Sequence, residues 1–322
     1  MNAPQLITFR SKLGSHALGD HYRVDIDTGF GSVPLSLCLL SNHWMDRPDL
    51  AARLEEEARV LDVLSHPHII QAAGMTRIEG RPALVTEYTR GRTLAQLIQR
   101  CALSDRPIPL SLIASIGASV ASAMHHACAT LARVHTDLSA ESLVLQPNGH
   151  VLLTRFEGSM IRGHGTQTTG QSSRSTDHPT AEYRAGATTD RNGDVHSLGT
   201  TLARLCTLKA PTIAITKEHG WAARLDAAPI SADQRRQLTT LLERMLSDTP
   251  EKRPDWATIY HRISALTGEP AQDSIASFCR DHAQPVPEQP VEDHLRGSFW
   301  ADTPIPPCST PIRTPRSAAS PA

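Results

Sequence analysis

Apolar and polar residues follow two different spacings along the chain, and each spacing predicts a different kind of structure. Residues 1–45 contain short apolar runs separated by turn residues, which predicts strands. Residues 49–64 place leucines at helical spacing opposite a row of acidic residues, which predicts an amphipathic helix. Residues 110–131 carry a continuous apolar stripe at helical spacing, which predicts a long helix of the core.

A predicted hairpin lies near the middle of the chain. Its apolar runs, Leu143–Leu145 and Val151–Leu153, flank the turn Q-P-N-G, and Asn-Gly is a strong hairpin signal. A polar loop with His135 and Asp137 leads into the hairpin, and Arg155 follows it. The candidate chemistry of the chain is concentrated on these two flanks.

Charge and cysteine content exclude several classes of function. The chain has 322 residues and a formal net charge of −1, so it lacks the electrostatic signature of a nucleic-acid or membrane-surface protein. The six cysteines show no C-x-x-C spacing, which indicates free thiols in a reducing compartment. The N-terminus lacks the apolar segment of a signal peptide, and no apolar run is expected to reach membrane length. We therefore expect a cytoplasmic protein that does not insert into membranes.

Composition changes near residue 268. Residues 268–322 are rich in proline and contain several Thr-Pro and Ser-Pro pairs. Such a segment has too few apolar residues to bury a core. We expect a largely disordered C-terminal tail.

Several motifs, in a fixed order, resemble those of the eukaryotic-type Ser/Thr protein kinases. They are S-H-P-H-I-I at 65–70, P-A-L-V-T-E-Y at 82–88, H-T-D-L at 135–138, D-R-N-G-D-V-H-S-L-G at 190–199 and L-L-E-R-M-L-S-D-T-P-E-K-R-P at 241–254. The resemblance covers about residues 10–267. It implies an α+β, two-lobed kinase-like fold with a small antiparallel-sheet N-lobe (about 10–85), a hinge (86–91) and a large, mainly helical C-lobe (about 92–267).

The resemblance also assigns the nucleotide-contacting positions of the family to residues of this chain. Among the departures from the family pattern there, Cys38 replaces the phosphate-binding lysine, Ser142 a metal-binding asparagine and Arg155 the metal-binding aspartate. The remaining candidate positions of this ATP site are Gly14 and Gly19 of the glycine-rich loop, Lys12 before it, the helix glutamate Glu57, and Thr86, Glu87 and Tyr88 of the hinge.

These departures predict lost catalysis. Asp137 remains where the family places the base that faces the substrate hydroxyl, but Arg155 brings a cation to the place of Mg²⁺. Loss of one preorganised electrostatic group typically costs roughly 10²–10³ in rate. The resemblance therefore implies a catalytically impaired pseudokinase that acts as a protein-binding or allosteric module. Mg²⁺ is not expected, and ATP binding is left open.

Two alternatives remain open. One is an active, atypical Ser/Thr kinase that uses Asp137 as base, a lysine supplied from Lys12, and Glu157 or Glu141 as metal ligand. The other is a sensor that binds ATP without transferring phosphate.

The residues that stabilise the family fold are largely retained. His135 and Asp194 are expected to hold the catalytic loop, with Asp194 accepting hydrogen bonds from the backbone near His135. Glu182 and Arg253 are expected to form a buried ion pair. Since Glu57 has lost its lysine partner, we also predict an ion pair between Glu57 and Arg155.

Overall fold

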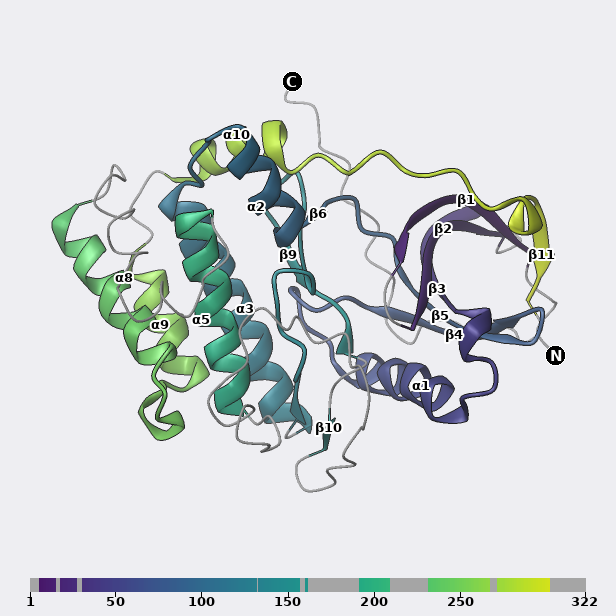
Figure 1. Cartoon of the computed structure of the whole chain (residues 1–322), viewed down its shortest axis with the longest axis horizontal. Coiled ribbons are helices and arrows are strands. Elements are labelled where there is room, and N and C mark those ends of the chain that lie inside the picture. Colours follow the sequence, from purple (N-terminus) through teal and green to yellow (C-terminus); the bar gives the residue numbers. More distant parts are fainter. Residues whose placement is uncertain are drawn as a thin grey trace. The chain divides into compact units, whose positions relative to one another are not determined.

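A computed structural model describes residues 6–15, 18–27, 31–131, 133–156, 160–161, 191–208, 231–266 and 271–301. The chain divides into two compact units. The first unit comprises residues 1–65, 70–89 and 286–322, and the second comprises residues 66–69 and 90–285. The fold is the expected one, with a curled antiparallel sheet in the first unit and a mainly helical second unit (Figure 1).

The first unit is built on a six-stranded sheet in the order β11-β1-β2-β3-β5-β4. Helix α1 (Pro48–Val63) packs against β4 and β5 through its leucine face, as its sequence pattern predicts. The 3-10 turns η1 (Asn42–Trp44) and η4 (Asp293–Leu295) also belong to this unit. The strands are β1 (Leu6–Ser15), β2 (Gly19–Asp27), β3 (Ser32–Leu40), β4 (Ala72–Ile78), β5 (Arg81–Glu87) and β11 (Ser298–Trp300).

The register of the sheet decides which side chains share a face. Tyr22 pairs with Leu37, and Lys12 pairs with Tyr22, so these three side chains lie on one face. Cys38 follows Leu37 and therefore points to the opposite face. The face of Leu37 carries the main apolar cluster of the unit, which includes Ile7, Phe9, Tyr22, Val24, Leu35, Leu37 and Leu39.

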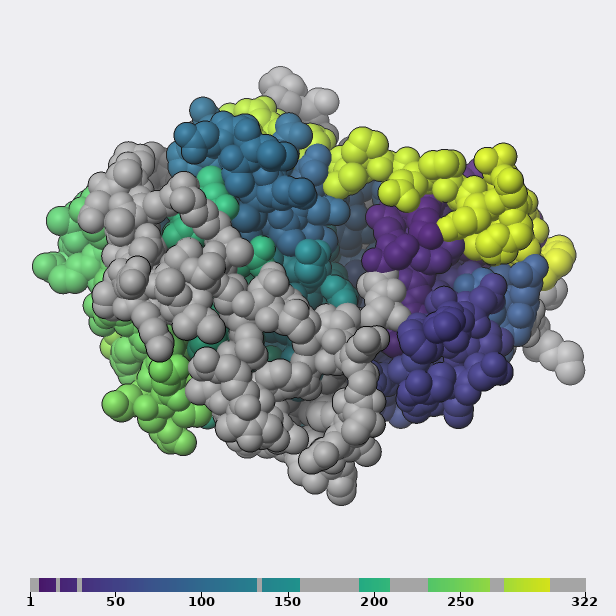
Figure 2. Space-filling model, in the orientation of Figure 1, coloured from purple at the N-terminus to yellow at the C-terminus, as the bar shows by residue number. Residues whose placement is uncertain are grey.

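The C-terminal segment completes this cluster, in contrast to the expected disordered tail. Strand β11 pairs with β1, and Val291, Leu295 and Ala301 are buried in the same apolar cluster as Leu37. Figure 2 shows the yellow C-terminal residues lying against the purple N-terminal strands. Proline-rich composition concealed these few apolar anchors, each of which removes apolar surface from water. Within 268–322, residues 271–301 are thus described as structure, and 302–322 lie outside the described residues.

The second unit is organised around the long helix α3 (Leu110–Leu131), which packs against α5 and α9 (Figure 1). The expected hairpin is present as β8 (Leu143–Leu145) and β9 (Val151–Leu153), with β6 (Arg92–Thr93) beside β8. The other elements are α2 (Leu94–Leu103), β7 (Arg133–Val134), β10 (Met160–Ile161), α5 (Arg191–Thr207), α8 (Ala232–Met245), η3 (Pro250–Lys252), α9 (Trp256–Ser264) and α10 (Ala271–His282).

Helix α3 corrects the expectation that no apolar run reaches membrane length. Its 22 residues are long and apolar enough to cross a bilayer. However, 56% of its most apolar stretch is buried inside the protein. The helix packs against α5 and α9, and residues such as Ile113, Ile116 and Val120 are buried, so α3 has the burial of a core helix.

The C-terminal segment should contribute measurably to stability. We expect Leu295→Ala to destabilise the protein by about 2–5 kcal/mol, because it leaves a cavity in the apolar cluster. Leu103→Ala removes the same atoms from a side chain that is 84% exposed and should change stability by less than about 0.5 kcal/mol. Chemical denaturation of the two variants measures the difference. Equal effects would show that the segment does not stabilise the sheet.

Candidate functional site

The side chain of Asp194 holds the loop between β7 and β8 through the backbone of that loop. Its carboxylate accepts hydrogen bonds from the backbone N–H of His135 (2.7 Å) and of Thr136 (2.9 Å). Asp194 lies in the first turn of α5 and is buried. Thr136 has a φ of 63°, a left-handed conformation that costs a non-glycine residue about 1–2 kcal/mol. The predicted hydrogen bonds are therefore present, and they stabilise a strained loop.

The imidazole of His135 connects this loop to the end of the hairpin. Its Nε2 lies 2.9 Å from the carbonyl oxygen of Thr154, and its Nδ1 accepts a hydrogen bond from the backbone N–H of Asp137 (3.3 Å). The ring also packs against Phe156, with 4.7 Å between ring centroids. His135 thus positions both Asp137 and the residue that follows Thr154, which is Arg155.

Ser142 is engaged by its own loop. Its hydroxyl donates to the carbonyl oxygen of Ser139 (3.1 Å) and accepts from the backbone N–H of Ser139 (3.0 Å). Ser142 is fully buried, and its carbonyl oxygen accepts from Thr154. The side chain at the asparagine position of the family therefore closes a local turn and makes no approach to solvent. This geometry is poorly suited to metal ligation.

Arg155 and Asp137 form the charged pair of this site. The Nη2 atom of Arg155 lies 3.7 Å from Oδ2 of Asp137, and the two side chains are only 16% and 10% exposed. Arg155 has a φ of 67°, so the backbone adopts a costly conformation at the residue that supplies the cation. The carboxylate at the position of the family's base is thus partly neutralised by an arginine of the same chain.

Residues that could hold a metal ion are scarce in the part of the chain that the structure describes. No group of three or more His, Cys, Asp or Glu side chains with suitable geometry occurs there. Glu141 is exposed, and its carboxylate lies 3.5 Å from the hydroxyl of Thr93. Glu157, the other proposed metal ligand, lies outside the described residues, so its role stays a prediction.

The first unit holds the residues at the lysine and glutamate positions of the family, Cys38 and Glu57. Cys38 and Glu57 are both buried, each with about 5% exposure. Cys38 lies in β3 opposite Leu84 of β5, and Glu57 lies on the buried face of α1. Because Glu57 and Arg155 belong to different units, the predicted ion pair between them stays a prediction.

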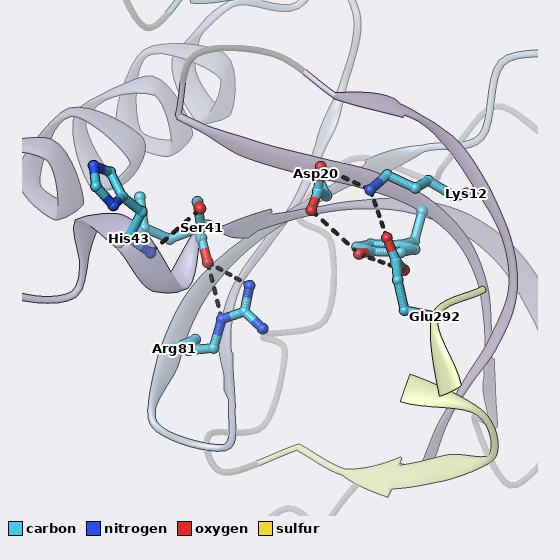
Figure 3. Close-up of polar contacts among 8 residues, drawn as sticks. Lys12, Asp20, Ser41, His43, Arg81 and Glu292 are labelled. Atoms are coloured by element: carbon cyan, nitrogen blue, oxygen red, sulfur yellow. Dashed lines mark hydrogen bonds and ion pairs between the residues drawn. The ribbon is translucent and has the colours of Figure 1, made fainter. Parts of the chain in front are cut away.

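Lys12 does not share the face of Cys38. As the register shows, its side chain lies on the opposite face of the sheet, where its Nζ atom contacts Glu292 (2.5 Å) and Asp20 (3.0 Å). Figure 3 shows Lys12 between these two carboxylates. The structure therefore places Lys12 away from the position at which the atypical-kinase alternative needs it. Glu292 and its neighbour Glu288 were missed, since both lie in the proline-rich segment.

Close packing of two strands requires a glycine at position 19. A Cβ atom there would lie 2.0 Å from the carbonyl oxygen of Leu39, so only glycine allows β2 and β3 to pair so closely. Gly14, at the end of β1, would meet no such obstacle.

The hinge residues continue the sheet from β5. Glu87 is buried, and its carboxylate and backbone N–H both bond the backbone of Gln71. Thr86 pairs with Ser36 of β3. Tyr88 donates a hydrogen bond to Glu288 (2.6 Å). All three hinge residues thus have structural partners within the first unit.

Arg253 is buried, as expected for a structural residue of this fold. Its guanidinium donates to the carbonyl oxygens of Ser247 and Asn192, both at 2.9 Å. Glu182 lies outside the described residues, so the predicted Glu182–Arg253 pair is untested.

Comparisons with known proteins agree with this architecture. The family model described as protein tyrosine and serine/threonine kinase matches residues 7–263. The chain is 26% identical over 230 residues to human mitogen-activated protein kinase kinase kinase 11, covering 68% of this chain and 27% of that protein. It is 23% identical to the serine/threonine-protein kinase Pkn1 of Myxococcus xanthus, covering 91% of this chain and 43% of that protein. The chain thus spans less than half the length of these relatives.

A solved structure has the same fold. It is a double mutant of the Mycobacterium tuberculosis PknI kinase domain, which superimposes with a TM-score of 0.60. The alignment covers 81% of this chain and 96% of that domain at 22% identity.

Asp194 should be among the most sensitive positions of the second unit. We expect Asp194→Ala to destabilise the protein by about 2–4 kcal/mol, because two buried N–H groups lose a charged acceptor. Asp233→Ala removes an exposed aspartate from the first turn of α8 and should cost less than about 1 kcal/mol. Thermal and urea unfolding of both variants provide the measurement. If Asp194→Ala proved as mild as its control, the carboxylate would not be what holds the loop.

Proposed function

The chain belongs to the protein tyrosine and serine/threonine kinase family, and from this premise we propose that it is a catalytically impaired member. In our proposal the domain retains the fold for binding a protein partner or for allosteric control. Transfer of phosphate is absent or very slow.

The observation that carries this proposal is the ion pair between Arg155 and Asp137. A base that accepts a proton from a substrate hydroxyl must present a carboxylate with room for that hydroxyl. Here the carboxylate already faces a guanidinium, which occupies the space that the hydroxyl needs and opposes the approach of a metal cation by charge repulsion. The Ser142 hydroxyl is engaged by the backbone of Ser139 and so is a poor metal ligand. The thiol of Cys38 lacks the positive charge of the lysine that it replaces.

An active, atypical Ser/Thr kinase is the second candidate. Its support is that Asp137 is retained and that Asp194 and His135 hold its loop in place. The candidate needs a positive charge for the phosphates, however, and Lys12 lies on the wrong face of the sheet to provide it.

A nucleotide sensor that binds ATP without Mg²⁺ would place Arg155 against the phosphates.

We also propose that the domain acts in the cytoplasm. The described cysteines, Cys38, Cys101, Cys128, Cys206 and Cys279, are all free thiols, which fits a reducing compartment.

The proposal is tested by incubating the full chain with radiolabelled ATP, Mg²⁺ or Mn²⁺, and generic protein substrates. We expect incorporation at the level of Asp137→Ala, at least about 10³-fold below an active kinase, because more than one electrostatic group is lost. Robust transfer by the wild type that disappears in Asp137→Ala would overturn the proposal and favour the atypical kinase.

A thermal-shift titration separates the module from the sensor. A melting temperature that rises with ATP equally in the presence and absence of Mg²⁺ would indicate metal-independent nucleotide binding. An unchanged melting temperature in both conditions fits a module that binds no nucleotide.

A further inference from the structure

The C-terminal residues 286–301, which we call the latch, use two carboxylates among their attachments to the first unit. Glu288 accepts hydrogen bonds from Ser11 and from Tyr88, and its Oε2 atom lies 3.7 Å from Nη1 of Arg23. Glu292 accepts from Lys12 (2.5 Å) and from Tyr22 (2.9 Å). Five side chains from β1, β2 and the hinge thus converge on two acidic residues spaced four apart.

The charges of the Glu292 cluster are mutually supporting. Burial alone would raise the pKa of Glu292 and of Asp20, but hydrogen bonds, including those from Lys12, hold both pKa values below their usual range. Burial, together with Glu292, raises the pKa of Tyr22, so this hydroxyl stays a donor. Figure 3 shows the cluster between β1, β2 and the latch. At neutral pH the Glu292 carboxylate of the latch is therefore held by the Lys12 cation and by the neutral hydroxyl of Tyr22.

Backbone pairing extends the attachment along β1. Lys12 and Gln289 exchange two backbone hydrogen bonds (2.9 and 3.0 Å), and Phe9 donates to the carbonyl oxygen of Gly297. Strand β11 then pairs with Leu6–Thr8. The latch thus occupies an edge of β1 that would otherwise expose unpaired backbone groups.

The latch also begins where the chain returns to the first unit. The chain leaves this unit after Thr89 and re-enters it at Val286. The hydrogen bond between Tyr88 and Glu288 joins the two chain segments next to these points. A change at the latch is therefore transmitted directly to the hinge residue Tyr88.

We propose that the latch is a releasable clamp, with Glu288 and Glu292 as its two fastening points, that closes the β1 edge and fixes the hinge at Tyr88. Polar attachment makes such release local, because buried apolar contacts are few and are concentrated at Val291, Leu295 and Ala301. Release exposes an edge strand, the kind of surface to which an extended segment adds by strand pairing.

Amide hydrogen exchange of the full-length protein tests the clamp. Glu288→Gln/Glu292→Gln keeps the shape of both side chains and removes their charge. We expect amides of the latch, together with Phe9 and Lys12, to exchange roughly tenfold or more faster, since several charged hydrogen bonds are weakened together. Helix α3 serves as an internal reference and should be unchanged.

Two further variants separate release from general damage. Asp293→Asn changes a neighbouring exposed carboxylate that pairs with Arg296 and should leave exchange as in the wild type. Tyr88→Phe should accelerate exchange around Glu288 and at the hinge. Unchanged latch exchange in the double variant, or equal acceleration throughout α1, β3 and β5, would overturn the clamp.

A reversible lock provides a second check. The hydroxyls of Thr8 and Ser298 are 2.8 Å apart on paired residues of β1 and β11. Oxidised Thr8→Cys/Ser298→Cys in the double-glutamine background should restore slow exchange in the latch, and continued fast exchange would contradict the clamp. Because these measurements need neither nucleotide nor partner, their outcome is independent of whether catalysis is lost.

Discussion

The candidate site of the second unit depends on one buried carboxylate, Asp194, that holds two backbone N–H groups of a strained loop. Without this acceptor, His135 and Thr136 would bury unpaired donors, and the left-handed conformation of Thr136 would have nothing to oppose its cost. The position of His135 in turn fixes Asp137 and the chain at Thr154. The geometry of the candidate site therefore depends on the hydrogen bonds of Asp194, a residue with a structural role only.

Because the loop is held by its backbone, the side chains beside it can differ from the family pattern without loss of the fold. The residues that hold the loop are retained, so Asp137 stays in place. Arg155 then meets Asp137 as an ion pair in a nearly buried setting, where a cation and a carboxylate compensate each other's desolvation. Ser142 satisfies its hydroxyl within its own turn. Arg155 and Ser142 are thus structurally compatible with their neighbours.

Local patterns were sufficient to predict much of the fold. The Asn-Gly turn between two apolar runs predicted the hairpin, the leucine spacing predicted α1, and the motif around Asp194 predicted its hydrogen bonds. The ion pair between Arg155 and Asp137 was not predicted, because several carboxylates lie within reach of a long side chain and only tertiary geometry selects among them. The face of Lys12 was missed for a similar reason: sequence does not reveal strand register across the bulges of β1.

The C-terminal latch shows a different limit. Its mean composition is that of a disordered segment, but stability depends on a few residues such as Leu295 and on Glu292 facing Lys12, a partner far away in the sequence. Averages over a window cannot detect such sparse anchors. The described structure therefore extends to residue 301, beyond the domain boundary expected near residue 267.

We propose that Arg155 occupies the place at which an active kinase would hold its metal ion. A crystal structure grown with Mn²⁺ and a non-hydrolysable ATP analogue tests this directly through the anomalous signal of manganese. We predict no manganese peak within about 2.5 Å, the range of direct metal–oxygen ligation, of Oγ of Ser142 or of an Asp137 oxygen. We also predict that Arg155 remains paired with Asp137. A manganese ion bound to Asp137 or Ser142, with Arg155 displaced, would contradict the claim.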